Sequence, residues 1–401
     1  MTEKTAKMRI GVLASHPIQY QAPLFRELAR EVDLTVYFAH RQTAEGQARA
    51  GYGVAFDWDV DLLSGYASEF LQNQAKNPNV FNYGGCDTPE IATIIQKGDF
   101  DAFIVTGWYL KSYWQAIRAC RRHGVPVLVR GDSQLHTPRS WLKRMAKKVV
   151  YRWIMRQFDG YLYVGKRNLE YLLYYGATRE RCFFSPHFID VDWFRTKSHQ
   201  TDEERRALRL SLGVQEDEKL LLFVGRLVEM KCPSDLLKAA ALLKAQGVAV
   251  RPVYVGSGRL EADLVKQAQR LGIKASFAGF KNQSELPVIY AAADLFILPS
   301  ESETWGLTVN EAQACGTLAV ISTAVGCMPD LIADGMTGKS YVSGDLRALA
   351  DAVMTMLPRV QTEACLKALQ DKSAEYSVSN AVAGIITAIS SVAQGKVKLH
   401  G

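Results

Sequence analysis

Two glutamates mark the stretch of the chain best suited to bind a ligand. Residues 295–298 form a short apolar run of the length that a buried parallel strand needs, and Pro299 and Ser300 end it. Glu303 lies in the loop that follows, and Gly306 permits a tight turn into a helix that carries Glu311. Carboxylates accept hydrogen bonds from sugar hydroxyls, and the N–H groups of a helix start suit a phosphate. The pattern predicts a nucleotide-sugar site at the carboxyl end of a strand.

Two cations follow an earlier predicted strand, residues 219–224. The strand ends at Gly225 and Arg226, and Lys231 comes five residues after Arg226. A glycine lets the backbone approach a ligand closely, and two fixed cations can neutralise a diphosphate leaving group. Arg and Lys near a strand end are common, so these two cations carry weight only together with the glutamates of residues 295–316, and for that stretch a strand–loop–helix crossover with solvated acids is the alternative interpretation.

Two further strand ends are expected at the same edge of this second sheet. A strand over residues 252–255 leads to Gly256, in a turn that we expect to line the nucleotide pocket. A strand over residues 275–278 leads to Gly279, Phe280 and Lys281.

Together these stretches resemble the retaining glycosyltransferases of family 4 (glycosyl transferases group 1), which have the GT-B fold. In that family a Pro-Ser strand end precedes a Glu, seven residues and a second Glu followed by Ala, here Pro299, Ser300, Glu303, Glu311 and Ala312. The resemblance implies that Glu303 contacts the donor sugar and Glu311 the ribose. It implies that Arg226 and Lys231 take the role of a metal ion, and that the loop at Phe280 reads the nucleobase.

The resemblance thus gives expected site residues. We expect Glu303, Arg226 and Lys231 to be catalytic. The expected donor-binding residues are Gly225, Arg226, Lys231, Gly256, Phe280, Lys281, Glu303, Thr304, Trp305, Gly306, Leu307 and Glu311. The co-substrate implied is a nucleotide-diphospho-sugar, with UDP as the first expectation, and neither a metal nor another cofactor is expected.

The resemblance is looser in the first half of the chain. Many family members carry a His-Asp pair after a strand that here spans residues 125–129. Asp132 matches the Asp, but Gly131 stands in the place of the His and Arg130 precedes it. The candidates for the acceptor side are His16, Trp108, Arg130 and Asp132. For His16 and the aromatic residues a purely structural role is the alternative, and no general base is assigned, because in this family the leaving phosphate can take the acceptor proton.

The segment 140–158 has the pattern of a basic amphipathic helix. Its cations include Lys143, Arg144, Lys147 and Lys148, and tryptophans lie on its apolar stripe. Such a helix can bind an anionic membrane surface, as helices in this family do near lipid-linked acceptors. The alternative is a helix that packs its stripe on the sheet and solvates its charges. No recognisable nucleic-acid module accompanies the charge.

A chain of 401 residues exceeds what one core usually supports. Alternating strands and helices predict an α/β protein of GT-B fold, with two Rossmann-like domains facing each other across a cleft. We expect an acceptor domain over residues 1–194, a nucleotide-sugar domain over 195–375, and a helix over 376–401 that returns to the first domain. Residues 40–87 are long for a connection. They indicate an excursion with a small satellite core or, alternatively, an acceptor-side flap.

Composition favours a soluble globular protein, with 48% apolar residues and a net charge of +7. No apolar run approaches the roughly 18 residues that span a bilayer. The seven cysteines are scattered and never spaced as a ligand pair, which argues against disulfides and structural zinc and fits a reducing cytoplasm. We expect a cytoplasmic protein, peripheral at the inner face of the membrane if the basic helix docks there.

Two rival functions come from other classes. A nucleotide-sugar epimerase would share the fold and bind the donor without an acceptor. A non-catalytic membrane-docking protein would keep a decayed donor site, an idea that the missing His near Asp132 keeps open.

Overall fold

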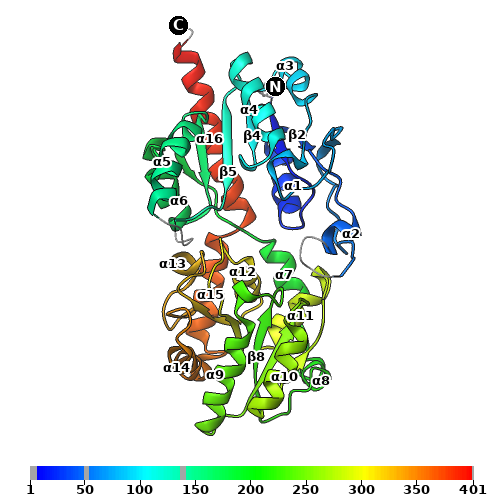
Figure 1. Ribbon diagram of the computed structural model, residues 1–401, viewed down its shortest axis with the longest axis vertical. Helices are drawn as coiled ribbons and strands as arrows, with labels where there is room; N and C mark the ends of the chain where they lie inside the picture. Colours follow the sequence, from blue (N-terminus) through cyan, green and yellow to red (C-terminus); the bar gives the residue numbers. More distant parts are fainter. Residues whose placement is uncertain (1–6, 49–53, 136–140, 400–401) are drawn as a thin grey trace, which may run out of the picture. The chain divides into compact units, whose positions relative to one another are not determined.

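A computed structural model describes residues 7–48, 54–135 and 141–399, and for residues 141–146 and 394–399 it describes the backbone alone (Figure 1). The chain divides into two compact units, each built on a parallel sheet. The first unit comprises residues 1–42, 61–187 and 378–401, and the second comprises residues 43–60 and 188–377. The chain therefore passes from one unit to the other four times.

The sheet of the first unit has seven parallel strands in the order β3-β2-β1-β4-β5-β6-β7. Their bounds are β1 Arg9–Ala14, β2 Asp33–Phe38, β3 Ala67–Phe70, β4 Ala102–Val105, β5 Val127–Gly131, β6 Gly160–Tyr163 and β7 Cys182–Phe184. Strand β4 is apolar along its whole length and β1 is apolar after the exposed Arg9, as strands covered on both faces require. The strand order reverses between β1 and β4, so the loops after these two strands part there.

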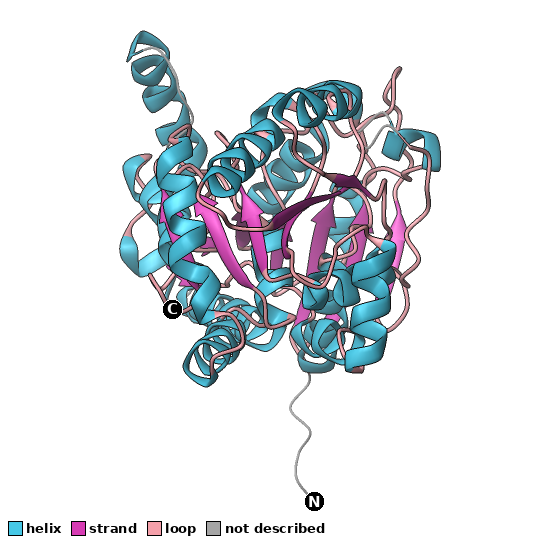
Figure 2. Ribbon diagram, turned by 90° about the horizontal axis from the view of Figure 1, so that it is seen from below, coloured by secondary structure: helices cyan, strands magenta, loops and turns pink. Residues whose placement is uncertain are grey.

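Helices lie around the strands (Figure 2). Those of the first unit are α1 Gln21–Glu31, α3 Ile91–Lys97, α4 Lys111–His123, α5 Trp141–Met155, α6 Lys166–Tyr174 and α16 Val378–Leu399, with 3-10 turns η2 Tyr83–Gly85 and η3 Arg179–Arg181. The C-terminal helix α16 packs against α1, β6 and β7. A Cβ at Gly384 would lie 1.8 Å from the carbonyl oxygen of Phe184, so glycine permits this close approach.

The sheet of the second unit has six parallel strands in the order β10-β9-β8-β11-β12-β13. Their bounds are β8 Lys219–Val224, β9 Val250–Val255, β10 Ser276–Phe277, β11 Leu295–Leu298, β12 Leu318–Ser322 and β13 Gly338–Tyr341. The order reverses between β8 and β11. Ligands of open α/β sheets bind at the carboxyl ends of the strands at such a point.

The helices of the second unit are α2 Ala44–Gln47, α7 Val191–Lys197, α8 Asp202–Ser211, α9 Pro233–Ala245, α10 Glu261–Leu271, α11 Leu286–Ala292, α12 Leu307–Ala314, α13 Met328–Leu331, α14 Leu346–Met356 and α15 Glu363–Glu375. Short 3-10 turns lie at η4 Glu229–Lys231, η5 Gln283–Glu285 and η6 Leu357–Arg359. The core between α9, α14 and the strands consists of fully buried aliphatic residues such as Leu221, Leu237 and Val353. The second unit carries the loops of the predicted donor site.

The expected α/β class and the two Rossmann-like sheets are confirmed, and the predicted strands lie within a few residues of the observed ones. The units divide the chain differently from the expected ranges. Residue 194 lies inside helix α7, and the change of unit falls at residue 187 instead. Residues 43–60 belong to the second unit although they precede most of the first. Because the residues that they contact in the second unit are distant in sequence, no local sequence pattern predicts this assignment.

Candidate functional site

The loops after β8, β9 and β10 lie directly beside one another. The N–H of Gly225 donates to the carbonyl of Val255 at 2.9 Å, and the N–H of Gly256 donates to the carbonyl of Gly279 at 2.8 Å. Gly256 has a φ of +127°, and a Cβ there would lie 2.1 Å from the carbonyl oxygen of Gly225. Glycine is required at this position because both the backbone conformation and the close packing exclude a side chain.

Lys231 and Glu303 form an ion pair between the loops on either side of the switch point. Their side chains are only 16% and 17% exposed. The N–H of Glu301 donates to the carbonyl of Met230 at 3.0 Å, which joins the same two loops through the backbone. The structure thus brings together a cation and a carboxylate that lie 72 residues apart.

Arg226 lies close enough to Lys231 to affect its protonation. Burial, with the positive charge of Arg226 second, lowers the pKa of Lys231 to about 8. Glu303 favours the charged ammonium, but this pairing does not offset burial among cations. A bound diphosphate would neutralise the excess positive charge that Arg226 and Lys231 concentrate here.

The turn before α12 is fixed by its neighbour after β12. The N–H groups of Gly326 and Cys327 donate to the carbonyls of Glu303 and Trp305, at 3.0 and 2.9 Å. Gly306, with a φ of +102°, then leads into α12, which begins at Leu307. Thr304 has its carbonyl 1.8 Å from where a Cβ of Gly326 would lie, so this packing again needs glycine. The start of α12 is therefore held beside the Lys231–Glu303 pair.

Glu311 is 8% exposed and accepts a hydrogen bond of 2.7 Å from the hydroxyl of Tyr290. Burial raises the pKa of Glu311 to about 7, although the Tyr290 hydrogen bond opposes the shift. The residue pattern alone did not indicate Tyr290. It comes from α11, and nothing in the sequence shows that this helix lies beside α12.

The side chain of Trp305 lies elsewhere than expected for a donor-binding group. Its indole is 3% exposed, donates to Asn310 at 2.8 Å and packs against Tyr376 with ring centroids 5.8 Å apart. A large apolar ring gains more from this burial than from an exposed edge. Only its backbone remains suited to a ligand.

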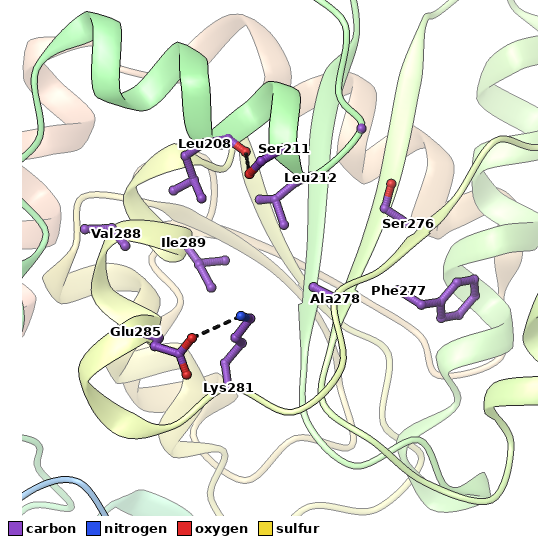
Figure 3. A pocket seen from close by; sticks show the side chains of 11 residues that line it. Leu208, Ser211, Leu212, Ser276, Phe277, Ala278, Lys281, Glu285, Val288 and Ile289 are labelled. Carbon is purple, nitrogen blue, oxygen red and sulfur yellow. Dashed lines mark hydrogen bonds and ion pairs between the residues drawn. The ribbon is translucent and has the colours of Figure 1, made fainter.

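In the loop after β10, the side chains of Phe280 and Lys281 lie in different surroundings. The ammonium of Lys281 pairs with Glu285 at 3.0 Å and points into a pocket of about 540 Å³ between α8, β10 and α11 (Figure 3). The ring of Phe280 instead packs against Phe56, with centroids 4.3 Å apart. Phe56 comes from residues 43–60 and was not singled out from the sequence as a site residue.

In the first unit a pocket of about 90 Å³ opens at the carboxyl ends of β4 and β5. Arg130, Asp132 and Tyr20 line it, together with Thr106 and His187. Arg130 is buried and donates to the carbonyls of Pro186 at 2.9 Å and Ser185 at 3.4 Å. Burial lowers the pKa of Arg130 to about 10, so it remains charged near neutral pH.

Tyr20 shares this pocket and the sequence did not indicate it. Burial, with the charge of Asp132 second, raises its pKa to about 12. It belongs to the same loop as His16, and that position was the available signal. The neutral hydroxyl can therefore donate or accept a hydrogen bond beside Asp132 and Arg130.

His16 and Trp108 occupy different surroundings. Burial, with His40 second, lowers the pKa of His16 to about 4, and its Nδ1 lies 3.0 Å from the hydroxyl of Ser15. The ring of Trp108 packs among Tyr151, Phe158 and Tyr171, with centroids 6.2–6.4 Å apart. Trp108 is thus partly buried against the core of the first unit, and its role toward an acceptor stays a prediction.

The basic segment forms helix α5. The side chains of Lys143 and Arg144 lie outside the described residues. The ammonium of Lys147 lies over the rings of Tyr151, Tyr171 and Tyr175 at 4.3–5.1 Å, and that of Lys148 lies 4.7 Å from the centre of Tyr174. Cation–π contacts hold these two charges against the protein instead of extending them into solvent.

Large apolar side chains on the same helix face solvent. Val149, Val150 and Trp153 are 74%, 54% and 56% exposed, and Trp153 stacks on Trp114 with centroids 5.5 Å apart. Exposed Arg152 and Arg156 lie among them in the sequence. No helix within the described ranges is both long and apolar enough to cross a membrane.

In the part of the chain that the structure describes, no three His, Cys, Asp or Glu side chains gather as a metal site. Metal independence of the reaction stays a prediction, since this finding does not test it.

Residues 204–364, within the second unit, match the family model for glycosyl transferases group 1. Among curated proteins, the chain is 36% identical over 205 residues to the D-inositol 3-phosphate glycosyltransferase of Mycolicibacterium smegmatis. The aligned region covers 50% of this chain and 45% of that protein. The enzyme of the same name from Mycobacterium bovis is 39% identical over 172 residues, covering 42% and 34%. The chain thus aligns with less than half the length of these relatives.

Solved structures match nearly the whole chain. Anabaena HepE, in complex with UDP and glucose, has a TM-score of 0.70 at 19% identity, covering 96% of this chain and all of that one. Sucrose-phosphate synthase from Thermosynechococcus elongatus has a TM-score of 0.71 at 17% identity, covering 96% and 99%. The two Rossmann-like sheets and these likenesses give the chain the GT-B fold, and residues 204–364 of its second unit match glycosyl transferases group 1.

Proposed function

We propose that the protein is a retaining glycosyltransferase that moves a sugar from a nucleotide-diphospho-sugar to a hydroxyl acceptor. The observation that carries the proposal is the partly buried Lys231–Glu303 pair beside Arg226, at the switch point of the second sheet. These groups provide two cations for a diphosphate and one carboxylate for sugar hydroxyls. The match to glycosyl transferases group 1 covers the same region of the chain.

The chemistry assigned to these residues is neutralisation of a leaving group. The bond from the anomeric carbon to the phosphate oxygen breaks as negative charge grows on the diphosphate. Arg226, Lys231 and the N–H groups at the start of α12 stabilise that charge. Glu303 orients the sugar through its hydroxyls, so the reacting atoms are held close together.

The acceptor hydroxyl forms its new bond to the anomeric carbon on the face that the phosphate leaves. Its proton passes to the departing phosphate oxygen, which balances the step without a protein base. The neutral His16 is not needed for this transfer. Retention of anomeric configuration and independence from metal both follow from this scheme and are part of the proposal.

UDP is the nucleotide that we propose for the donor. Support comes from the Anabaena relative in structure, which is described in complex with UDP, with UDP-glucose, and with UDP and glucose. Glu311 would contact the ribose hydroxyls by exchanging, or sharing, its hydrogen bond with Tyr290. Because the Tyr290 hydroxyl and the donor ribose compete for the Glu311 carboxylate, donor binding should weaken or break the Tyr290–Glu311 hydrogen bond.

The acceptor is proposed to bind at the first unit's pocket, where Tyr20, Arg130 and Asp132 meet. These groups suit a hydroxylated acceptor, with Asp132 accepting a hydrogen bond and Tyr20 able to donate one. The curated relatives are named for inositol 3-phosphate, which makes a phosphorylated polyol a first acceptor to test. A sugar or lipid-linked acceptor remains within the proposal.

Helix α5 is proposed to bring the enzyme to an anionic membrane surface. Exposed valines and Trp153 can enter the headgroup region while Arg152 and Arg156 approach lipid phosphates. Lys147 and Lys148 contribute less to this than the sequence implied, since tyrosine rings hold them.

A turnover assay tests the proposed function. UDP-, GDP- and ADP-sugars are each incubated with D-inositol 3-phosphate and with simple sugars, and release of the nucleoside diphosphate is followed. We expect acceptor-dependent release that Glu303→Gln reduces by at least about a hundredfold, a typical loss for a positioned polar group. Full turnover by a folded Glu303→Gln variant would contradict the assignment. Nuclear magnetic resonance of the product's anomeric centre tests retention.

A further inference from the structure

Residues 54–60, here named the strap, lie on the second unit although they precede most of the first in sequence. Exposure along the strap alternates, with Phe56, Trp58 and Val60 partly buried and Asp57 and Asp59 exposed. This period of two is that of an extended segment that turns one face to its neighbour. The strap therefore packs on the second unit as an ordered strand-like segment.

The strap's partner is the loop over residues 279–284, which follows β10. Phe56 packs on Phe280 with ring centroids 4.3 Å apart and a tilt of 37°, and Trp58 meets Phe56 edge-on at 4.9 Å. An aromatic pair at this distance is in direct contact. The ring of Phe280 is therefore packed against the strap through Phe56.

Polar contacts fix the same two segments along their length. The side-chain amide of Asn282 donates to the carbonyl of Asp57 at 2.8 Å. The N–H of Ser284 donates to the carboxylate of Asp59 at 3.2 Å, and the hydroxyl of Ser284 also bonds to it. Asn282 meanwhile accepts from the N–H of Gln283 at 2.9 Å. One asparagine thus joins the strap to the start of η5.

The loop held in this way borders the proposed donor site. The carbonyl of Gly279 accepts from the N–H of Gly256, whose turn abuts Gly225 beside Arg226. The loop therefore lies two strand ends from the cations, along the carboxyl edge of the sheet. A nucleotide whose diphosphate lies at Arg226 and Lys231 would extend its base along this edge.

We propose that the strap positions the 279–284 loop for the nucleobase, with Phe56 acting through Phe280 as a positioning residue for donor affinity. This rests on the proposed function, since it concerns the base of the same donor. The catalytic groups Lys231 and Glu303 lie outside the contact. Loss of the Phe56 ring should therefore weaken donor binding without lowering the turnover rate of the bound complex.

The test compares two probes, UDP and inorganic pyrophosphate, by calorimetric titration of the full chain. Phe56→Ala should raise the Kd for UDP by about three- to tenfold, the scale of an aromatic pair, and leave the Kd for pyrophosphate unchanged. Phe56→Tyr keeps the ring and should restore UDP affinity. In turnover, Phe56→Ala should raise KM for the donor with kcat unchanged.

Phe81→Ala is the matched control, since Phe81 belongs to the same long excursion but is 58% exposed in the first unit. It should leave both affinities unchanged. A second test pairs Asp59→Ala with Ser284→Ala, and the double variant should bind UDP no more weakly than the weaker single variant. These two residues lie away from the catalytic groups.

Three results would overturn the proposal. They are an unchanged UDP affinity in Phe56→Ala, an equal loss for UDP and pyrophosphate, and full additivity of the Asp59 and Ser284 variants. Failure of the proposed function is distinguishable, because then the wild-type protein would bind neither UDP nor any other nucleoside diphosphate. If the wild type binds GDP or ADP instead, the same comparison is made with that nucleotide.

Discussion

Burial of Lys231 disfavours the positive charge that its proposed function requires. In the proposed function its ammonium neutralises the donor diphosphate, yet burial and Arg226 lower its pKa to about 8. Binding an anion favours the protonated form, so the complex has a higher pKa than the free protein. Proton uptake and nucleotide binding are therefore linked at this side chain.

This linkage predicts how affinity depends on pH. Below pH 8 Lys231 is charged and the Kd for a nucleoside diphosphate should be nearly constant. As pH rises above about 8 the free protein loses the charge, and the Kd should rise by up to about tenfold per pH unit. Titration between pH 6.5 and 9.5 measures this. Lys231→Arg should flatten the profile, and a wild-type profile already flat across this range would contradict the prediction.

Glu311 gives a second prediction at this scale, one about stability. Its folded pKa of about 7 lies above the ordinary 4.5, so the folded protein binds the proton more tightly than the unfolded chain. Its contribution is full below pH 4.5 and is lost as pH rises to about 7. Relative to Glu311→Gln, the wild type should lose about 3 kcal/mol of unfolding free energy across that window.

Chemical denaturation of both proteins at pH 5 and pH 8 measures the effect of Glu311. The difference between the two proteins isolates this group, because the other titrating residues are common to both. An identical pH dependence of the wild type and Glu311→Gln would show that the carboxyl does not titrate in this window.

At the scale of elements, helix α5 shows how a pattern can be right in its helix and incomplete in its surface. Periodicity predicted a helix over residues 140–158, and Trp141–Met155 is helical. Periodicity could not show that Lys147 and Lys148 would lie over tyrosine rings from α5 and α6, since that depends on how the helices pack. The face that remains open combines apolar side chains with arginines.

That face predicts a membrane-binding phenotype. Val149→Asp with Val150→Asp should reduce partition into vesicles containing anionic lipid, because a charged side chain is costly in the interface and repels the lipid phosphates. Co-sedimentation with vesicles measures this. Val342→Asp is the control, since Val342 is 65% exposed in the second unit. Equal partition of all three proteins would leave α5 as a solvated helix.

At the scale of the whole molecule, the order of the strands determines which features could be predicted from the sequence. Strands such as β8, β11 and β12 are short apolar runs ended by glycine, proline or serine, so their positions and the switch-point site between them were readable. Arg226, Lys231, Glu303 and Gly306 lie in the loops that follow β8 and β11. Their neighbourhood is a consequence of strand order, which alternating strands and helices already constrain.

The remaining features depend on contacts between segments far apart in sequence. Phe56 meets Phe280 across 224 positions of the chain, and Tyr290 meets Glu311 through the packing of two helices. Trp108 and Trp305 follow strand ends as ligand-binding rings would, yet Trp305 is buried in its unit and Trp108 is partly buried among other aromatic rings. Local patterns cannot separate a buried ring from an exposed one when both positions lie at a strand end.

The measurement that tests the central assignment most directly is calorimetric titration of the wild type and Arg226→Ala with UDP, GDP and ADP. We expect one of these nucleotides, UDP first, to bind the wild type, and Arg226→Ala to lose at least about tenfold in affinity through the missing charge–phosphate contact. A matched thermal unfolding scan of both proteins checks that the variant is folded. Absence of binding by every nucleoside diphosphate, or equal affinity in Arg226→Ala, would contradict a donor site at this switch point.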